Sequence, residues 1–232
     1  MHISLLLRFT AFILCLGSTA NHITPAARHA GHNLYTNDQE WKVTINDGWF
    51  SAKTLRYGAY STSPRKNGVT PAANLTFKNI DNAFNFLVKD SSEQILVQAL
   101  NTPRVTFSGR SLPAWLDKTP PTNPLFYMLI NGTQSNPLVR WELLLKNPHF
   151  LELNDNKPVG ILRSPGTDIR ITAHNRFGIA NSYEKLCYEF HYKGNAIAAV
   201  MPGQQPRVWV SKKVSGDMQK VLAAAIGALL FR

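Results

Sequence analysis

A run of eleven consecutive apolar residues, 221–231, constrains the fold of this chain more than any other feature. The run is rich in alanine and leucine, which favour helix. Before it stand Ser215, which suits an N-cap, and Asp217, which suits the positive end of a helix. Because apolar residues go all the way round this helix, it must be buried. Eleven residues span about 16 Å as a helix, roughly half of a bilayer core, so the pattern predicts a buried helix over residues 217–231 and no integral membrane span.

Most of the remaining chain predicts short strands, because apolar or alternating runs are separated by turn residues. The turns contain Asn-Gly, Asp-Gly and Lys-Gly-Asn sequences, which accept positive φ and suit antiparallel hairpins. The predicted strands, about a dozen, cover residues 41–45, 49–55, 84–88, 95–100, 105–107, 126–130, 138–145, 150–153, 159–162, 169–172, 186–192, 196–200 and 208–210. The small residues of the predicted helix would let these strands approach closely, so the fold class is all-β, a mainly antiparallel barrel-like sheet around one buried C-terminal helix.

Three pairs of these strands resemble one repeated hairpin, namely 84–88 with 95–97, 150–153 with 159–162, and 188–190 with 197–200. Their unequal spacing excludes a solenoid or propeller, which needs a near-constant period. The proline-rich residues 103–124 are interpreted as a long loop. A single domain over residues 38–232 follows from this organisation.

The N-terminal residues predict export. Arg8 precedes an apolar stretch over residues 9–16 and small residues up to Ala20, which is typical of a signal peptide over residues 1–20 and too short for a membrane anchor. Residues 21–37 are polar and without a hydrophobic period, and are interpreted as a flexible leader. We therefore expect a periplasmic or secreted protein, with association to the cell envelope as a further option.

The cysteines and charges add two constraints. Only Cys187 remains after cleavage, so no intramolecular disulfide can form. Alternation places Cys187, Glu189 and His191 on one strand face, but about 6.6 Å between alternate residues is too far to share a proton or metal without help from other strands, so we predict no metal site. Lys plus Arg number 25 against 14 Asp plus Glu, a formal net charge of +11 that favours partners of negative charge.

Catalytic motifs are absent from the sequence. Residues 63–66 match S-x-x-K, but Pro64 and the turn after it do not start a helix, and no partner motifs follow. His149, His174 and His191 are isolated along the chain, and no pair of carboxylates stands out. We expect no cofactor and, because an exported chain without a nucleic-acid motif rarely meets nucleic acid, no nucleic-acid partner. Asn74 and Asn131 begin glycosylation sequons whose use depends on the source.

The predicted strands, the segment 207–213 and the apolar helix after it together resemble the tubby C-terminal-like superfamily, which includes the phospholipid scramblase and LURP-one families. The resemblance covers about residues 76–232 and is clearest over residues 150–231. It implies a closed barrel around a hydrophobic C-terminal helix and a non-enzymatic function, which in some members is binding of phosphoinositides or other anionic lipids. No lipid-contacting residue of the family matches a position here, and the predicted signal peptide departs from the family.

A basic segment over residues 55–68 is the candidate ligand-binding region, because aromatic, hydroxyl and basic side chains together can hold an anionic group. The candidate residues are Arg56, Arg65, Lys66, Lys212 and Lys213. The alternative interpretation of this segment is a solvated basic loop. The leading hypothesis is an exported, non-catalytic envelope protein that binds an anionic lipid or other acidic ligand. The alternatives are a structural or protein-interaction module without a small ligand, whose partner the sequence does not name, and an unrecognised hydrolase.

Overall fold

The structure is a computed structural model that describes residues 34–49, 52–69, 75–78, 81–107, 111–117, 123–179 and 182–232. These residues all belong to one compact unit, Gly31–Arg232. The predicted signal peptide, the predicted leader as far as residue 33, and the sequon residue Asn74 lie outside the described residues.

Antiparallel strands make up most of the regular secondary structure. The strands are β1 (Glu40–Trp41), β2 (Val43–Asn46), β3 (Thr54–Tyr57), β4 (Tyr60–Thr62), β5 (Lys66–Asn67), β6 (Leu75–Lys78), β7 (Asp81–Lys89), β8 (Gln94–Thr102), β9 (Arg104–Phe107), β10 (Leu125–Ile130), β11 (Trp141–Leu145), β12 (Pro158–Ser164), β13 (Thr167–His174), β14 (Cys187–Tyr192), β15 (Asn195–Met201) and β16 (Arg207–Val210). The helices are α1 (Ala114–Asp117), the 3-10 helix η1 (Phe150–Glu152) and α2 (Gly216–Phe231). Fourteen strands form one sheet in the order β1-β16-β15-β14-β13-β12-β11-β10-β8-β7-β4-β3-β2, with β5 added to β7, while β6 and β9 pair separately.

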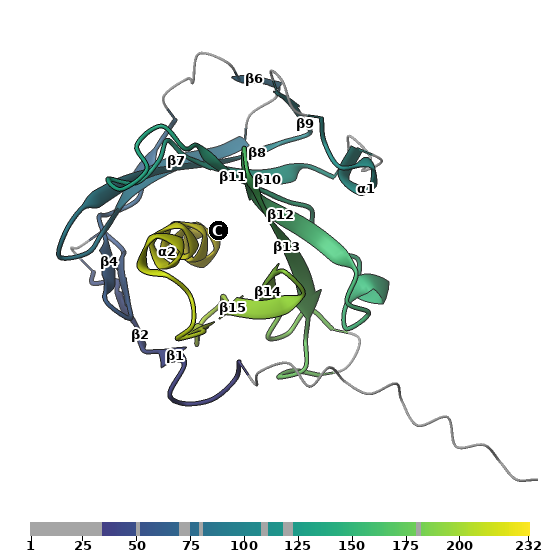
Figure 1. The fold of residues 1–232 in the computed structure, drawn as a ribbon. Coiled ribbons are helices and arrows are strands. Elements are labelled where there is room, and N and C mark those ends of the chain that lie inside the picture. The colour runs from purple at the N-terminus through teal and green to yellow at the C-terminus, as the bar shows by residue number, and fades with distance from the viewer. Residues whose placement is uncertain are drawn as a thin grey trace, which may run out of the picture. The chain divides into compact units, whose positions relative to one another are not determined.

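The two ends of the large sheet belong to one stretch of chain. β1 pairs with β16, β2 pairs with β3, and only Lys42 separates β1 from β2. Arg207 donates from Nε and Nη2 to the two carboxylate oxygens of Glu40, at 2.8 and 2.7 Å, and secures the seam between β1 and β16. The sheet is therefore a nearly closed antiparallel barrel interrupted at Lys42, and the predicted fold class is confirmed (Figure 1).

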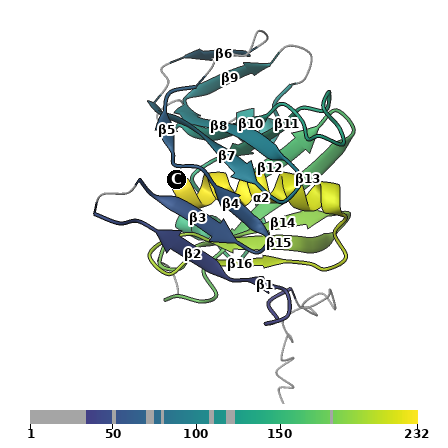
Figure 2. The same ribbon diagram turned by 90° about the vertical axis from the view of Figure 1, so that its left-hand side faces the viewer.

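Helix α2 runs through the middle of this barrel (Figure 2). All eleven residues of the apolar run, 221–231, are buried. They pack against inward-facing side chains of the wall, such as Phe84, Phe86 and Val88, which alternate along β7. The predicted buried helix is confirmed, and within the described part of the chain no helix combines the length and apolarity that crossing a membrane requires.

The two ends of α2 are held differently. At its first turns, Lys220 Nζ lies 2.5 Å from Glu93 Oε1, which ties the helix to the connection between β7 and β8. Ser215 occupies the N-cap position, but its side chain makes no capping hydrogen bond. At the other end, Arg65 Nη1 donates to the Phe231 carbonyl at 3.1 Å. Charged groups therefore anchor an otherwise apolar helix at both ends.

The second of the three predicted hairpins is wrong. Residues 150–153 were expected to form a strand, but Phe150–Glu152 forms the 3-10 helix η1, and β12 pairs with β11 and β13. His149 explains the difference, because its N–H donates to Glu152 Oε2 at 3.0 Å and its Nδ1 accepts from the Leu151 N–H at 3.3 Å. This reciprocal capping favours a helical turn over an extended chain.

Smaller differences concern strand limits. The predicted strand 49–55 begins only at Thr54, and the predicted strand 138–145 begins only at Trp141. Short strands β4 and β5 were not predicted, and within residues 103–124 the structure contains β9, which matches the predicted strand 105–107, and the unpredicted helix α1. Leu34, at the end of the predicted leader, is buried against Trp209, so the folded unit includes it.

Candidate functional site

The five predicted basic residues do not form one patch. Arg65 and Lys66 lie beside the C-terminal end of α2, whereas Lys212 and Lys213 directly precede its N-terminal end. A helix of 16 residues is about 24 Å long, so the helix length separates the two pairs. Arg56 is exposed in the middle of β3, opposite Thr44 and Ser61. The structure therefore divides the predicted region between the two ends of the barrel.

Arg65 has a structural role at the end of the helix. Besides its hydrogen bond to the Phe231 carbonyl, its Nη2 donates to Asn82 Oδ1, and its Cζ lies 4.1 Å from the Phe84 ring centroid. The last carbonyls of a helix have no partner within the helix and carry partial negative charge. The Arg65 guanidinium offsets this partial negative charge. The helix end therefore repels an incoming anion less than it would without Arg65.

A cavity of about 280 Å³ opens at the same end of the barrel, lined by Lys53, Arg65, Asn67 and Phe231. The Lys53 ammonium lies 5.9 Å from the Phe231 ring centroid, so the Phe231 ring favours the positive charge of Lys53 at this position. These four residues provide two cations and an amide and contain no carboxylate. Lys66 is exposed beside Arg65 on β5. The volume lies just below the usual range for small-molecule sites, about 300 Å³ upward.

At the opposite end of the barrel, Lys212 and Lys220 are each paired with a carboxylate. Lys212 Nζ lies 3.0 Å from Asp38 Oδ2, and hydrogen bonds from Thr36 and Lys212 lower the pKa of Asp38 below its usual range. A cavity of about 470 Å³ at this end includes Glu93, whose charge pairs with Lys220. Neither feature leaves an excess of positive charge for an anion, in contrast to the cavity around Lys53 and Arg65.

A second group of polar side chains lies on the outer face of β13 and β14. The sequence placed Cys187, Glu189 and His191 on one face but too far apart to act together without another strand. That strand is β13, which brings His174 opposite Cys187. Glu189 accepts hydrogen bonds from the Tyr35 hydroxyl and from Arg176 Nη2.

Both histidines also face the Glu189 carboxylate. His174 Nε2 lies 3.3 Å from Oε1, and His191 Nε2 lies 3.2 Å from Oε2. Tyr35 Oη is 2.6 Å from His174 Nε2, so one hydroxyl joins the predicted leader to the barrel wall. The Glu189 carboxylate is therefore surrounded by donors from β13, β14 and the segment before β1.

The charges of this network suit structure better than catalysis. Burial raises the pKa of Glu189, but hydrogen bonds from His174, His191 and Tyr35 outweigh it and hold the pKa well below its ordinary value of 4.5. Burial raises the pKa of the Cys187 thiol to about 12, so the thiol is protonated at neutral pH and a poor nucleophile. Burial also lowers the pKa of His174. The network holds residues 34–35 against the barrel with a satisfied, ionised carboxylate.

Several of these residues were missed by sequence reasoning. Lys53 lies just before the basic segment and was not included in it, whereas Phe231 is distant along the chain and reaches Arg65 because it ends the buried helix α2. Tyr35 lay in the predicted leader, and Arg176 carried no motif. Comparison with known proteins finds no family model, no curated protein and no solved structure that matches this chain.

Proposed function

We propose that this chain is an exported, non-catalytic protein of the cell envelope that binds an anionic lipid or another acidic ligand at the cationic cavity. One observation carries the proposal. The cavity combines the Lys53 ammonium and the Arg65 guanidinium with the Asn67 amide, and the residues that line it include no carboxylate. Charge-assisted hydrogen bonds from such groups are strong, and a phosphate or carboxylate matches their donors.

Two further features support this function. The net charge of +11 attracts anionic surfaces as a whole. A nearly closed barrel around a buried apolar helix agrees with what the resemblance to the tubby C-terminal-like superfamily implies. We propose on this basis that the chain is a divergent, exported member of that superfamily.

The hydrolase alternative has less support from the described residues. Its best candidates, Cys187, Glu189 and His174, form the network on the outer face, where the thiol is protonated and Glu189 already accepts several hydrogen bonds. A general base must itself be free to accept a proton, and a nucleophile must be deprotonated or paired with such a base and within reach of substrate. The network offers neither in this arrangement.

Matched charge reversals at the two ends of the barrel test the proposal. Lys53→Glu with Lys66→Glu reverses two charges at the cavity end of the barrel. Lys212→Glu with Lys213→Glu reverses two charges at the opposite end. Binding is measured by co-sedimentation with vesicles of phosphatidylcholine, with and without phosphatidylglycerol, at low and high salt. Glycerol phosphate, which has the phosphate of the lipid headgroup but no acyl chains, serves as a soluble competitor.

We expect binding to anionic vesicles only, weakened by salt. A lysine near an anionic membrane contributes about 1 kcal/mol, so loss of two lysines at the cavity end weakens binding by about thirtyfold or more. The reversal at the opposite end leaves most of the binding. Equal effects of the two reversals would contradict the assignment of the site, and absence of binding would favour a protein-interaction module.

A further inference from the structure

Exposed apolar side chains gather at the end of the barrel where α2 ends. Seven large apolar side chains are exposed among the described residues, and five of them belong to three loops at this end. The five are Trp49 between β2 and β3, Phe150 and Leu151 between β11 and β12, and Ile179 and Tyr183 between β13 and β14. Trp49 is 95% exposed, and Ile179 and Leu151 are 68% and 65% exposed. Single exposed apolar residues are ordinary, but their concentration at one end calls for a partner.

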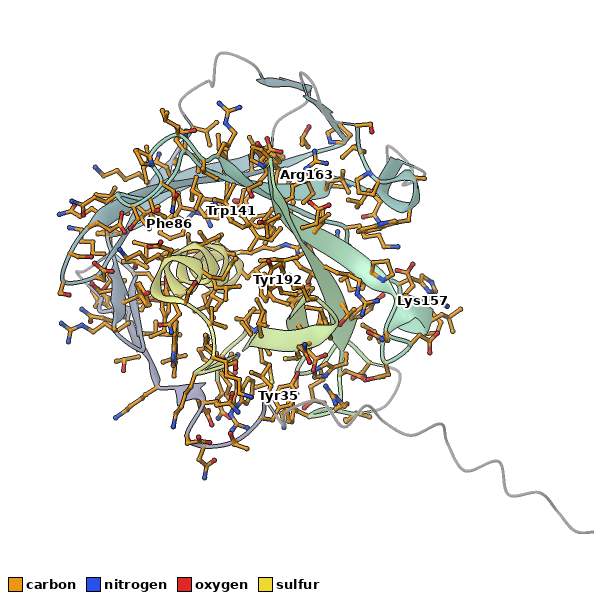
Figure 3. All side chains as sticks on the ribbon, viewed as in Figure 1. Tyr35, Phe86, Trp141, Lys157, Arg163 and Tyr192 are labelled. Carbon is orange, nitrogen blue, oxygen red and sulfur yellow. The ribbon has the colours of Figure 1, made fainter. Side chains whose placement is uncertain are left out.

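Contacts around the end of α2 hold these loops together. The loop of Trp49 also contains Lys53, whose ammonium faces the Phe231 ring. Arg232 donates to Asn147 Oδ1 on the loop between β11 and β12. Asn154 of that loop donates from Nδ2 to Asn175 Oδ1 at 2.8 Å, which reaches the loop between β13 and β14. Figure 2 shows the strand ends that border the β2–β3 loop on the side where α2 ends. The side-chain view in Figure 3 shows Lys157, from the loop between β11 and β12, at the edge of the barrel.

Positive charge surrounds these apolar residues. The described residues of the three loops, the segment 63–69 and the last residue include eight cations and four carboxylates. The cations are Lys53, Arg65, Lys66, Lys146, Lys157, Arg176, Lys185 and Arg232, and the carboxylates are Asp47, Glu152, Asp155 and Glu184. Two of these carboxylates already pair with lysines of the same loop, and Arg176 pairs with Glu189 of β14. A partner that fits this end is therefore negatively charged.

The spacing of the apolar residues indicates what kind of partner that is. They stand on separate loops with polar residues between them, whereas the core of a protein interface is a continuous, closely packed patch. Trp, Tyr and aliphatic side chains beside lysine and arginine are typical of surfaces that lie in the headgroup region of a membrane. A bilayer accepts separate side chains because lipids rearrange around each one.

We propose that this end of the barrel docks onto a bilayer that contains anionic lipids, with Trp49, Leu151 and Ile179 inserted among the headgroups. The inference rests on the proposed function and deepens it, because it names a membrane surface as the ligand instead of a free acidic molecule. The cations around the cavity neutralise lipid phosphates, and the axis of α2 stands steeply to the membrane. Residues at the opposite end remain in water.

Removal of the apolar side chains tests docking separately from charge. The test variant is Trp49→Ser with Ile179→Ser, and the control is Leu138→Ser, because Leu138 is also 95% exposed but lies between β10 and β11 at the opposite end. We expect the test variant to partition about tenfold more weakly into vesicles of phosphatidylcholine and phosphatidylglycerol, since it loses apolar burial. We expect the control to partition like the unchanged protein. Thermal unfolding verifies that both variants remain folded.

The possible failures are distinguishable. Equal partitioning of the test variant and the unchanged protein would overturn the docking proposal while leaving the charge reversals at Lys53 and Lys66 to decide the proposed function. Sedimentation velocity tests the other possible partner of this surface, a second copy of the chain, by measuring whether the protein is a monomer or a dimer. If the test variant loses a dimer instead of vesicle binding, a second copy of the chain covers these loops and the membrane proposal is wrong.

Discussion

Replacement of Gly227 by alanine is expected to destabilise the barrel, although alanine is the better helix former. An added Cβ would lie 2.5 Å from Tyr57 Oη and 3.1 Å from Phe86 Cε2. Both side chains are buried in the core, and the Tyr57 hydroxyl donates to the Ala223 carbonyl at 2.9 Å. The hydroxyl can therefore move away from a methyl group only by giving up its hydrogen bond.

The expected magnitude combines three effects. In a helix interior, alanine is more favourable than glycine by about 1 kcal/mol. Overpacking of a core costs about 1–3 kcal/mol, and a buried hydroxyl left without a partner costs about 1–3 kcal/mol. The net loss in the free energy of unfolding is therefore about 3 kcal/mol. For a domain of this size, that corresponds to a Tm lower by about 6–12 °C.

The assay is thermal and urea unfolding followed by circular dichroism, with two reference variants. Gly216→Ala adds a methyl group where nothing lies within 4 Å, so we expect it to leave stability unchanged or slightly raised. Tyr57→Phe removes the hydroxyl, so Gly227→Ala should cost less in that background, and the difference measures the coupling. The reasoning is refuted if Gly227→Ala stabilises the protein as Gly216→Ala does.

Two more predictions concern the core and the outer network. Leu222→Asp places an unpaired charge at a fully buried position of α2 and should prevent folding, because it costs several kcal/mol; a cooperative unfolding transition like that of the unchanged protein would contradict the buried helix. Burial lowers the pKa of His174, which faces Tyr35, Arg176 and Glu189, so its contribution to stability is present above its ordinary pKa of 6.5 and is lost as pH falls below it. His174→Gln should therefore reduce the loss of stability as pH falls below 6.5 in urea titrations, and an unchanged pH profile would argue against this assignment.

Much of the architecture could be predicted from local sequence. The apolar run 221–231 indicated a helix buried in protein, because it is apolar on every face and too short to span a bilayer. Turn sequences such as Lys193-Gly194 indicated antiparallel hairpins. Local patterns failed where a few hydrogen bonds decided the conformation. The short, mostly apolar run Phe150-Leu151-Glu152 resembles a strand, but capping by His149 makes it a helical turn. Strand β5 contains only two polar residues, so it had no hydrophobic pattern to reveal it.

The candidate site was predicted less completely, because its members are distant along the chain. Arg65 and Lys66 were found from their basic, hydroxyl-rich context, yet Lys53 lay just outside that context and Phe231 joins the site only because α2 ends there. Lys212 and Lys213 were placed in the same patch, but a buried helix of 16 residues stands between the two pairs. In the outer network, Cys187, Glu189 and His191 could be aligned on one strand. Tyr35 and His174 required knowledge of which elements cover and border that strand.

The orientation of the barrel at a membrane tests the central claim most directly. Tryptophan fluorescence is measured on vesicles of phosphatidylcholine and phosphatidylglycerol whose acyl chains are brominated, since bromine quenches only tryptophan that reaches the lipid. Trp49→Phe removes the probe at the proposed docking end, and Leu138→Trp in that background places one at the opposite end. The account predicts quenching that disappears with Trp49→Phe and does not return with Leu138→Trp. Quenching that persists in Trp49→Phe, or that appears with Leu138→Trp, would contradict it.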